Sequence, residues 1–239
     1  MKMFRYMKTK FSIILLLCFL SFSIGCSHRE IAMAGASLKD GPSLRIAVLP
    51  FQQIFPEDLQ KGAVESPLTG AIFDAVKPSG SPESMLEEGF LRYLEKSRQN
   101  LAVVAGERVA AVFRNISSSS MKLSLRKALC EAGKELGADL VVVGYLYRFR
   151  ELQGESFSAE RPASVAFEIV LLQAADGKVL WRGIFDRTQR SLMENLLQAA
   201  SFYHGKGRWM KAEELAAQGL EEVTKTFPAF PQHLKTEGL

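Results

Sequence analysis

Five apolar segments predict the strands of a sheet. Residues 44–50 and 101–105 are short runs rich in branched apolar side chains, which is typical of strands buried on both faces. Residues 165–173 and 178–187 flank Asp176-Gly177, a strong signal for a tight hairpin. Between these pairs lies an alternating strand, 140–150, on which one face is predicted to carry Val141, Val143, Tyr145, Tyr147 and Phe149.

Helical periodicity predicts helices packed on this sheet. One begins at Ser81-Pro82, a cap followed by proline, and places Leu86, Phe90 and Leu94 on one face. Another carries apolar residues at intervals of four, three and four and ends before Gly137, where a left-handed residue is favoured: Leu125, Leu129, Ala132 and Leu136. A capping-box pattern from Ser191 to Glu194 precedes helices expected at about 192–203 and 211–226.

The predicted order is βαβαβββαα. The first three strands need helical crossovers and should be parallel, whereas the last hairpin is antiparallel. The sequence therefore predicts an α/β (α+β) fold, with one mixed sheet in a single domain, 44–228, followed by a tail, 229–239. Residues 51–80, interrupted by prolines and glycines, are predicted to be irregular, and loops of that length are usually functional or mobile.

The amino terminus has the pattern of a secretory signal. Basic residues at positions 2, 5, 8 and 10 precede an apolar run, 11–20, that is too short to span a bilayer, which needs about 20 residues. Ser23-Ile24-Gly25-Cys26 follows and is typical of a bacterial lipobox. We therefore predict a signal peptide, 1–25, cleaved after Gly25, and acylation of Cys26, with ordinary cleavage nearby as the alternative.

A short tether is predicted between Cys26 and the domain. Residues 26–43 lack apolar periodicity, and a flexible chain of this length spans roughly 20 to 25 Å. Acyl chains on Cys26 would make the membrane a partner. Ser27 follows the cysteine where inner-membrane retention commonly uses Asp, so the predicted location is the outer membrane, with the domain facing the periplasm.

Charge and cysteine content exclude several classes of function. All the excess positive charge lies in the signal, so the mature chain has equal numbers of basic and acidic residues and no predicted nucleic-acid footprint. Cys18 leaves with the signal and Cys26 is acylated, which leaves Cys130 as a lone thiol in a helical pattern, without a disulfide partner. The three histidines show no ligand spacing, and no metal site is predicted.

Three segments carry a resemblance to a known family: Arg45-Ile46-Ala47-Val48-Leu49-Pro50-Phe51, Leu136-Gly137-Ala138-Asp139 and Val141-Val142-Val143-Gly144-Tyr145-Leu146. Residues 44–187 resemble the periplasmic α/β domain shared by curli-secretion lipoproteins, lipoprotein activators of peptidoglycan synthases and the amino-terminal domain of TolB. The resemblance implies a non-enzymatic scaffold that binds other envelope proteins or assembles with itself.

Motifs for catalysis are weak. Ser119-Ser120-Met121-Lys122 and Ser124-Leu125-Arg126-Lys127 fit the Ser-x-x-Lys pattern of penicillin-recognising enzymes, but the companion signatures are absent. Residues 117–120 are instead interpreted as a polar loop and helix start. We predict no catalytic residue, no cofactor and no small-molecule substrate. A cell-wall hydrolase is kept as a remote alternative.

The predicted function is a non-catalytic interaction, assembly or regulatory module, with an oligomeric component of an outer-membrane export system as the alternative. Its partner is an unidentified envelope protein or a second copy of the chain. Candidate contact residues are the aromatic series Tyr145, Tyr147 and Phe149, for which packing under a helix is the favoured interpretation, and Trp209 beside a glycine-rich turn.

Overall fold

The computed structural model describes residues 44–56, 62–78, 80–97, 101–119, 124–155, 158–189 and 209–230. The predicted signal peptide, Cys26, the tether and the helix expected at 192–203 lie outside the described residues. In the described ranges, no helix combines the length and apolar character that crossing a membrane requires.

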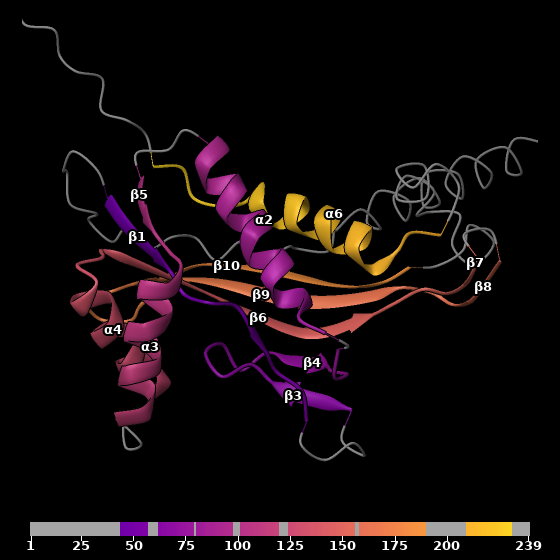
Figure 1. The fold of residues 1–239 in the computed structure, drawn as a ribbon, viewed down its shortest axis with the longest axis horizontal. Helices are drawn as coiled ribbons and strands as arrows, with labels where there is room; N and C mark the ends of the chain where they lie inside the picture. The colour runs from indigo at the N-terminus through magenta and orange to yellow at the C-terminus, as the bar shows by residue number, and fades with distance from the viewer. Residues whose placement is uncertain are drawn as a thin grey trace, which may run out of the picture. The chain divides into compact units, whose positions relative to one another are not determined.

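The main sheet is mixed, as predicted. Its strands lie in the order β10-β9-β6-β1-β5, and β2 pairs with β6 off this path (Figure 1). β1 pairs in parallel with both β5 and β6, whereas β6, β9 and β10 are antiparallel neighbours. These strands span Leu44–Val48 (β1), Gln52–Gln53 (β2), Leu101–Val104 (β5), Leu140–Arg150 (β6), Ser164–Gln173 (β9) and Val179–Thr188 (β10).

Each face of the sheet has its own core. The helices α2 (Pro82–Lys96) and α6 (Ala212–Thr224) pack on the first core, which includes Phe90, Leu146, Phe167 and Leu215. On the opposite face α3 (Glu107–Ser119) and α4 (Leu125–Glu135) pack on the second core, which includes Phe113, Leu129, Val143 and Val170. The predicted helix face at Leu86, Phe90 and Leu94 is confirmed, since all three side chains are buried.

Two turns also match the sequence prediction. Gly137, which follows the C-cap residue Leu136 of α4, has a φ of 62°, and Gly177 has a φ of 70° in the β9–β10 hairpin. Residues with a side chain rarely adopt this left-handed conformation. At Gly177 the space is limited as well, because an added Cβ would lie 2.7 Å from Cγ of Arg126 and 2.9 Å from Sγ of Cys130.

The prediction of an irregular stretch at 51–80 was wrong in part. β2 pairs with β6, and β3 (Ala63–Glu65) and β4 (Ile72–Asp74) form an antiparallel hairpin. The strands have two or three residues each, so their alternation was too short to stand out among the prolines and glycines. β7 (Gln153–Glu155) and β8 (Ser158–Arg161) form a second short hairpin.

Helix α3 was missed by the sequence analysis. Its buried residues Val109, Phe113 and Ile116 follow helical spacing, but the helix continues into Ser117–Ser119, a segment predicted as a polar loop and helix start. Serine has a lower helix propensity than alanine and favours caps and turns. Packing of the apolar face against α4 and the sheet overrides that preference here.

Candidate functional site: a buried charged network beneath the β3–β4 hairpin

A β-bulge at Tyr147 changes which side chains face the second core. Leu146 pairs with Phe167 and Arg148 pairs with Ala166, so Tyr147 is one extra residue in β6. Val141, Val143, Tyr145 and Tyr147 share the second core, as the alternation predicted. Phe149, which was predicted on the same face, lies in the first core instead. The bulge thereby brings Arg148 onto the face where alternation alone would have placed Phe149.

Glu168 is the acidic centre of this face. The residue is 0% exposed, and Tyr147 and Ser66 donate hydrogen bonds to its Oε2 at 3.1 and 2.6 Å. Its other oxygen accepts a hydrogen bond from Thr69 Oγ1 at 2.7 Å and lies 2.9 Å from Nε of Arg182. A buried carboxylate is tolerated only when it is paired and hydrogen-bonded, and this one is both.

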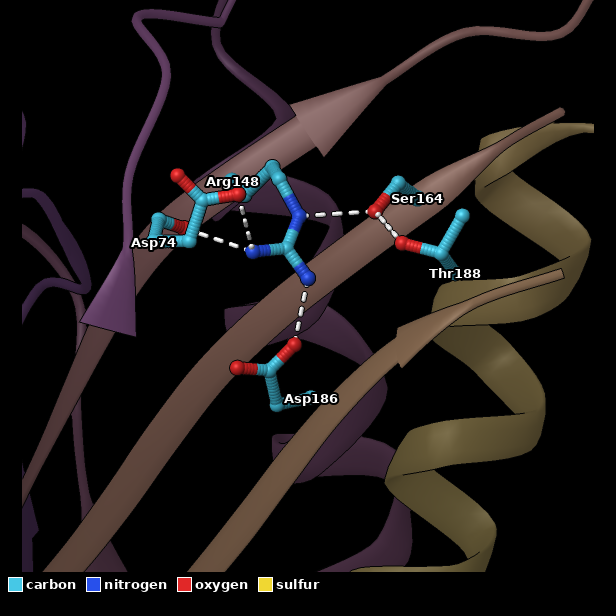
Figure 2. A network of polar contacts seen from close by, with 5 residues as sticks. All are labelled: Asp74, Arg148, Ser164, Asp186 and Thr188. Carbon is cyan, nitrogen blue, oxygen red and sulfur yellow. Dashed lines mark hydrogen bonds and ion pairs between the residues drawn. The ribbon is translucent and has the colours of Figure 1, made fainter. Parts of the chain in front are cut away.

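Arg148 is the basic centre, and it too is buried. Figure 2 shows its guanidinium among Asp74, Ser164 and Asp186. Its guanidinium donates to Oγ of Ser164 at 2.7 Å, to the backbone oxygen of Asp74 at 2.6 Å, and to the carboxylate of Asp186. Oδ2 of Asp74 lies 3.4 Å from Nη1 of Arg148. The hydroxyls of Ser164 and Thr188 share a hydrogen bond of 2.6 Å. Arg148 therefore connects β4, β6, β9 and β10 through one side chain.

Together these two charged groups fix the β3–β4 hairpin on the sheet. Glu168 holds the turn between β3 and β4 through Ser66 and Thr69, and Arg148 holds the end of β4. Between them the ring of Phe73 stacks on Tyr147 with centroids 3.9 Å apart. Val76 N completes the contact by donating to the carbonyl of Tyr147 at 3.0 Å, at the bulge itself.

The chemistry of this network is structural. The hydroxyls of Ser66 and Thr69 already donate to Glu168, and that carboxylate is neutralised by Arg182 and closed off from solvent. A general base must come within hydrogen-bond reach of the substrate proton that it abstracts. The Glu168 carboxylate is 0% exposed, so a substrate has no access to it. Among the described residues, no group of three or more His, Cys, Asp or Glu side chains could hold a metal ion.

The sequence-predicted contact residues have different places in the structure. Tyr145, Tyr147 and Phe149 are buried. Packing under a helix, the favoured interpretation, does not describe Tyr147, because its ring stacks on Phe73 of the β3–β4 hairpin. Trp209 is half-buried and lies just before α6. Cys26 lies outside the described residues. Sequence reasoning missed Glu168 and Arg148, although each is a charge in a largely apolar segment predicted as a strand, and that was the available signal.

Burial raises the pKa of both Tyr145 and Tyr147, and the nearby charge of Glu168 raises it further. In the folded state both phenols therefore stay protonated when the pH rises above the ordinary tyrosine pKa of about 10. Their contribution to stability is complete below about pH 10 and is lost as the pH rises above it, by about 1.4 kcal/mol per pH unit for each tyrosine.

This alkaline loss can be measured by urea unfolding between pH 8 and pH 11. We expect the Tyr145→Phe variant to lose about half as much of the tyrosine-linked stability as the wild type over the alkaline part of this range. Because both chains share every other titrating group, the difference between them isolates Tyr145. Equal slopes for the two chains would show that burial does not hold this proton.

The likenesses of this chain to known proteins are with solved structures. No protein-family model and no curated protein sequence matches the chain. A PelC dodecamer from Paraburkholderia phytofirmans matches at 13% identity and a TM-score of 0.43, over 80% of this chain and 89% of that one. The lipoprotein GNA1162 from Neisseria meningitidis matches at 14% identity and a TM-score of 0.37, over 69% of this chain and 99% of that one.

A third match is the LpoB C-terminal domain from Escherichia coli, at 13% identity and a TM-score of 0.33, over 66% of this chain and 90% of that one. At such low identity and TM-score, these three likenesses carry no conclusion about the family or the function of this chain.

Proposed function

We propose that this chain is an outer-membrane lipoprotein, anchored at Cys26, whose domain is a non-catalytic interaction module facing the periplasm. The lipobox supports the anchor. The observation that supports the non-catalytic role is the closed network around Glu168, whose buried carboxylate accepts hydrogen bonds from three hydroxyls and pairs with Arg182. Its hydroxyls are committed to the fold and its carboxylate is closed to any substrate.

The outer face of the β3–β4 hairpin is the surface we assign to a partner. Phe73 on β4 and Ala75 just after it are buried, while Ile72 and Val76 are exposed, Ile72 to 76%. Two buried charged residues fix the inner face of this hairpin to the sheet. A short apolar strip on a rigidly held element loses little conformational entropy on binding, which favours a contact role.

The anchor is tested by replacing Cys26 with alanine. Two or three acyl chains contribute about 0.8 kcal/mol per buried methylene, so their loss should release the protein from the membrane. We expect the wild type in the membrane fraction and the Cys26→Ala variant in the soluble fraction, with mass spectrometry of the amino-terminal peptide showing acylation in the wild type alone. Cys130→Ala is the matched control and should stay with the membrane. An unmodified Cys26 in membrane-bound wild type would contradict the proposal.

The partner is tested by crosslinking in cells. A photoreactive amino acid at Ile72 of the full chain should capture one distinct envelope protein, identified by mass spectrometry. The same group at Ala111, on the exposed side of α3, is the control for random capture. Equal patterns from the two positions would argue against the hairpin surface.

A further inference from the structure

The outer edge of β10 is a long strand edge. β10 has ten residues and stands at the end of the strand order, and within the described ranges no strand pairs with its outer side (Figure 1). Such an edge presents unpaired N–H and C=O groups that can pair with another chain. β10 contains no proline that would prevent this.

The outward groups can be assigned from one hydrogen bond. Gln189 N donates to the carbonyl of Ala163 at 3.0 Å, so the N–H of residue 189 points toward β9. Backbone groups alternate along a strand, and the β9–β10 register is regular from Trp181 to Thr188. The N–H and C=O groups of Arg182, Ile184 and Asp186 therefore point away from β9, into the open edge.

The side chains of these same three residues form a self-complementary series. All three lie on the face of the second core, and Ile184 is 39% exposed. In an antiparallel pairing of two β10 strands centred on Ile184, each isoleucine lies opposite the other. Arg182 then lies opposite Asp186 of the partner subunit, and Asp186 lies opposite Arg182 of the partner subunit. Directly opposite residues point to the same face of a sheet, so both pairs are in reach.

Both charged residues keep atoms for this contact. Arg182 uses Nε for Glu168, and Asp186 uses Oδ1 for Arg148. Among the described residues, the two terminal nitrogens of Arg182 and Oδ2 of Asp186 form no ion pair. Their side chains are 30% and 41% exposed, so they are reachable from the edge.

Only one register pairs both charged residues with opposite charges. The outward-pointing residues of the two strands must lie opposite each other to form hydrogen bonds, so one strand can shift along the other only in steps of two residues. One such step places Arg182 or Asp186 opposite Ile184 of the partner subunit. Two steps place Arg182 opposite its own copy, or Asp186 opposite its own copy, so that like charges meet.

We propose that two copies of this chain pair through β10, antiparallel, about a twofold axis at Ile184, and so join their sheets into one continuous sheet. An isologous contact of this kind closes on itself and stops at the dimer. The proposal deepens the interaction role proposed above by naming a second copy as one partner. It does not depend on the hairpin surface or on Cys26.

The test uses the full, lipidated chain in detergent and measures its mass by sedimentation across a range of concentrations. We expect wild-type dimers. Ile184→Lys places two like charges opposite each other and should weaken the dimer about tenfold or more. Ile184→Glu should do the same. Because lysine and glutamate attract, mixing the two variants should restore dimers as mixed pairs. Ile72→Lys is the matched control, an exposed isoleucine away from the edge, and should leave the dimer unchanged.

Disulfide trapping gives a second measurement. Residues opposite each other in a hydrogen-bonded antiparallel pair have Cα atoms about 5.5 Å apart, which a disulfide can span. In a Cys130→Ser background, Ile184→Cys should form a covalent dimer when diamide oxidises the two thiols to one disulfide and is itself reduced to the hydrazine. Ile72→Cys should stay monomeric under the same conditions.

Several results would overturn the proposal. They are a strictly monomeric wild type, a dimer that Ile184→Lys leaves intact, or equal trapping at positions 72 and 184. None of these results would change the crosslinks from Ile72 to an envelope partner or the membrane fractionation of Cys26→Ala. A failure of the dimer can therefore be distinguished from a failure of the proposed function.

Discussion

Replacing Glu168 with alanine should lower the free energy of unfolding by about 3 to 5 kcal/mol, the range found when one partner of a buried ion pair is removed. The substitution leaves Arg182 without its ion-pair partner and the hydroxyls of Ser66, Thr69 and Tyr147 without an acceptor. Each buried group left unsatisfied costs its full desolvation penalty. Urea unfolding followed by circular dichroism measures the loss.

A second consequence of the Glu168 substitution should be local. Since the β3–β4 turn is held by Ser66 and Thr69, hydrogen exchange should speed up at the amide of Thr69 and at that of Gly70, which donates to the carbonyl of Ser66. Glu65→Ala is the matched control, an exposed carboxylate on the same hairpin, and should change stability by less than about 0.5 kcal/mol. Equal losses for the two variants would mean that the network contributes no specific stability.

Replacing Phe90 with alanine should have a comparable cost, about 3 to 5 kcal/mol, because a large buried ring leaves a cavity that relaxes only partly. Phe90 is fully buried in the first core. Its ring packs edge-on against Phe227 at 5.6 Å between centroids and also contacts Phe51 and Tyr93. The loss should appear as a lower urea midpoint with an unchanged slope.

Phe55→Ala is the control for this second substitution. Phe55 is half-buried, and its ring has Lys77 at 5.2 Å from the centroid, so little core volume is removed. We expect it to cost clearly less than Phe90→Ala. A Phe90→Ala variant as stable as the wild type would show that α2 and α6 do not depend on this ring for packing.

The mixed sheet could be predicted because its strands are long and bounded by clear turns. The apolar runs at β1 and β6 and the Asp176-Gly177 turn determine the parallel and antiparallel pairings. Helix α3 and the β3–β4 hairpin could not be predicted in the same way. In both, tertiary packing overrides a weak local signal, from the serines of α3 and from strands of only three residues.

The candidate site was harder to predict because its position depends on one extra residue. A period of two assigns Phe149 to the face of Tyr145, and nothing in the amino-acid sequence of 140–150 shows that the strand bulges at Tyr147. The charge of Glu168 within the apolar strand 165–173 does indicate a buried polar contact. Its partners Ser66 and Thr69 lie about 100 residues earlier, as the separations of 102 and 99 show, and no local pattern connects them.

The position of α6 determines when the domain can finish folding as the chain is synthesised. The first core joins β1 and α2, near the start of the domain, to α6, Phe227 and Phe230 at its end. A chain that emerges amino terminus first delivers β1 and α2 well before these last residues. Until then one face of the sheet stays without its second helix, so the emerging chain completes its core only after nearly all of it has emerged.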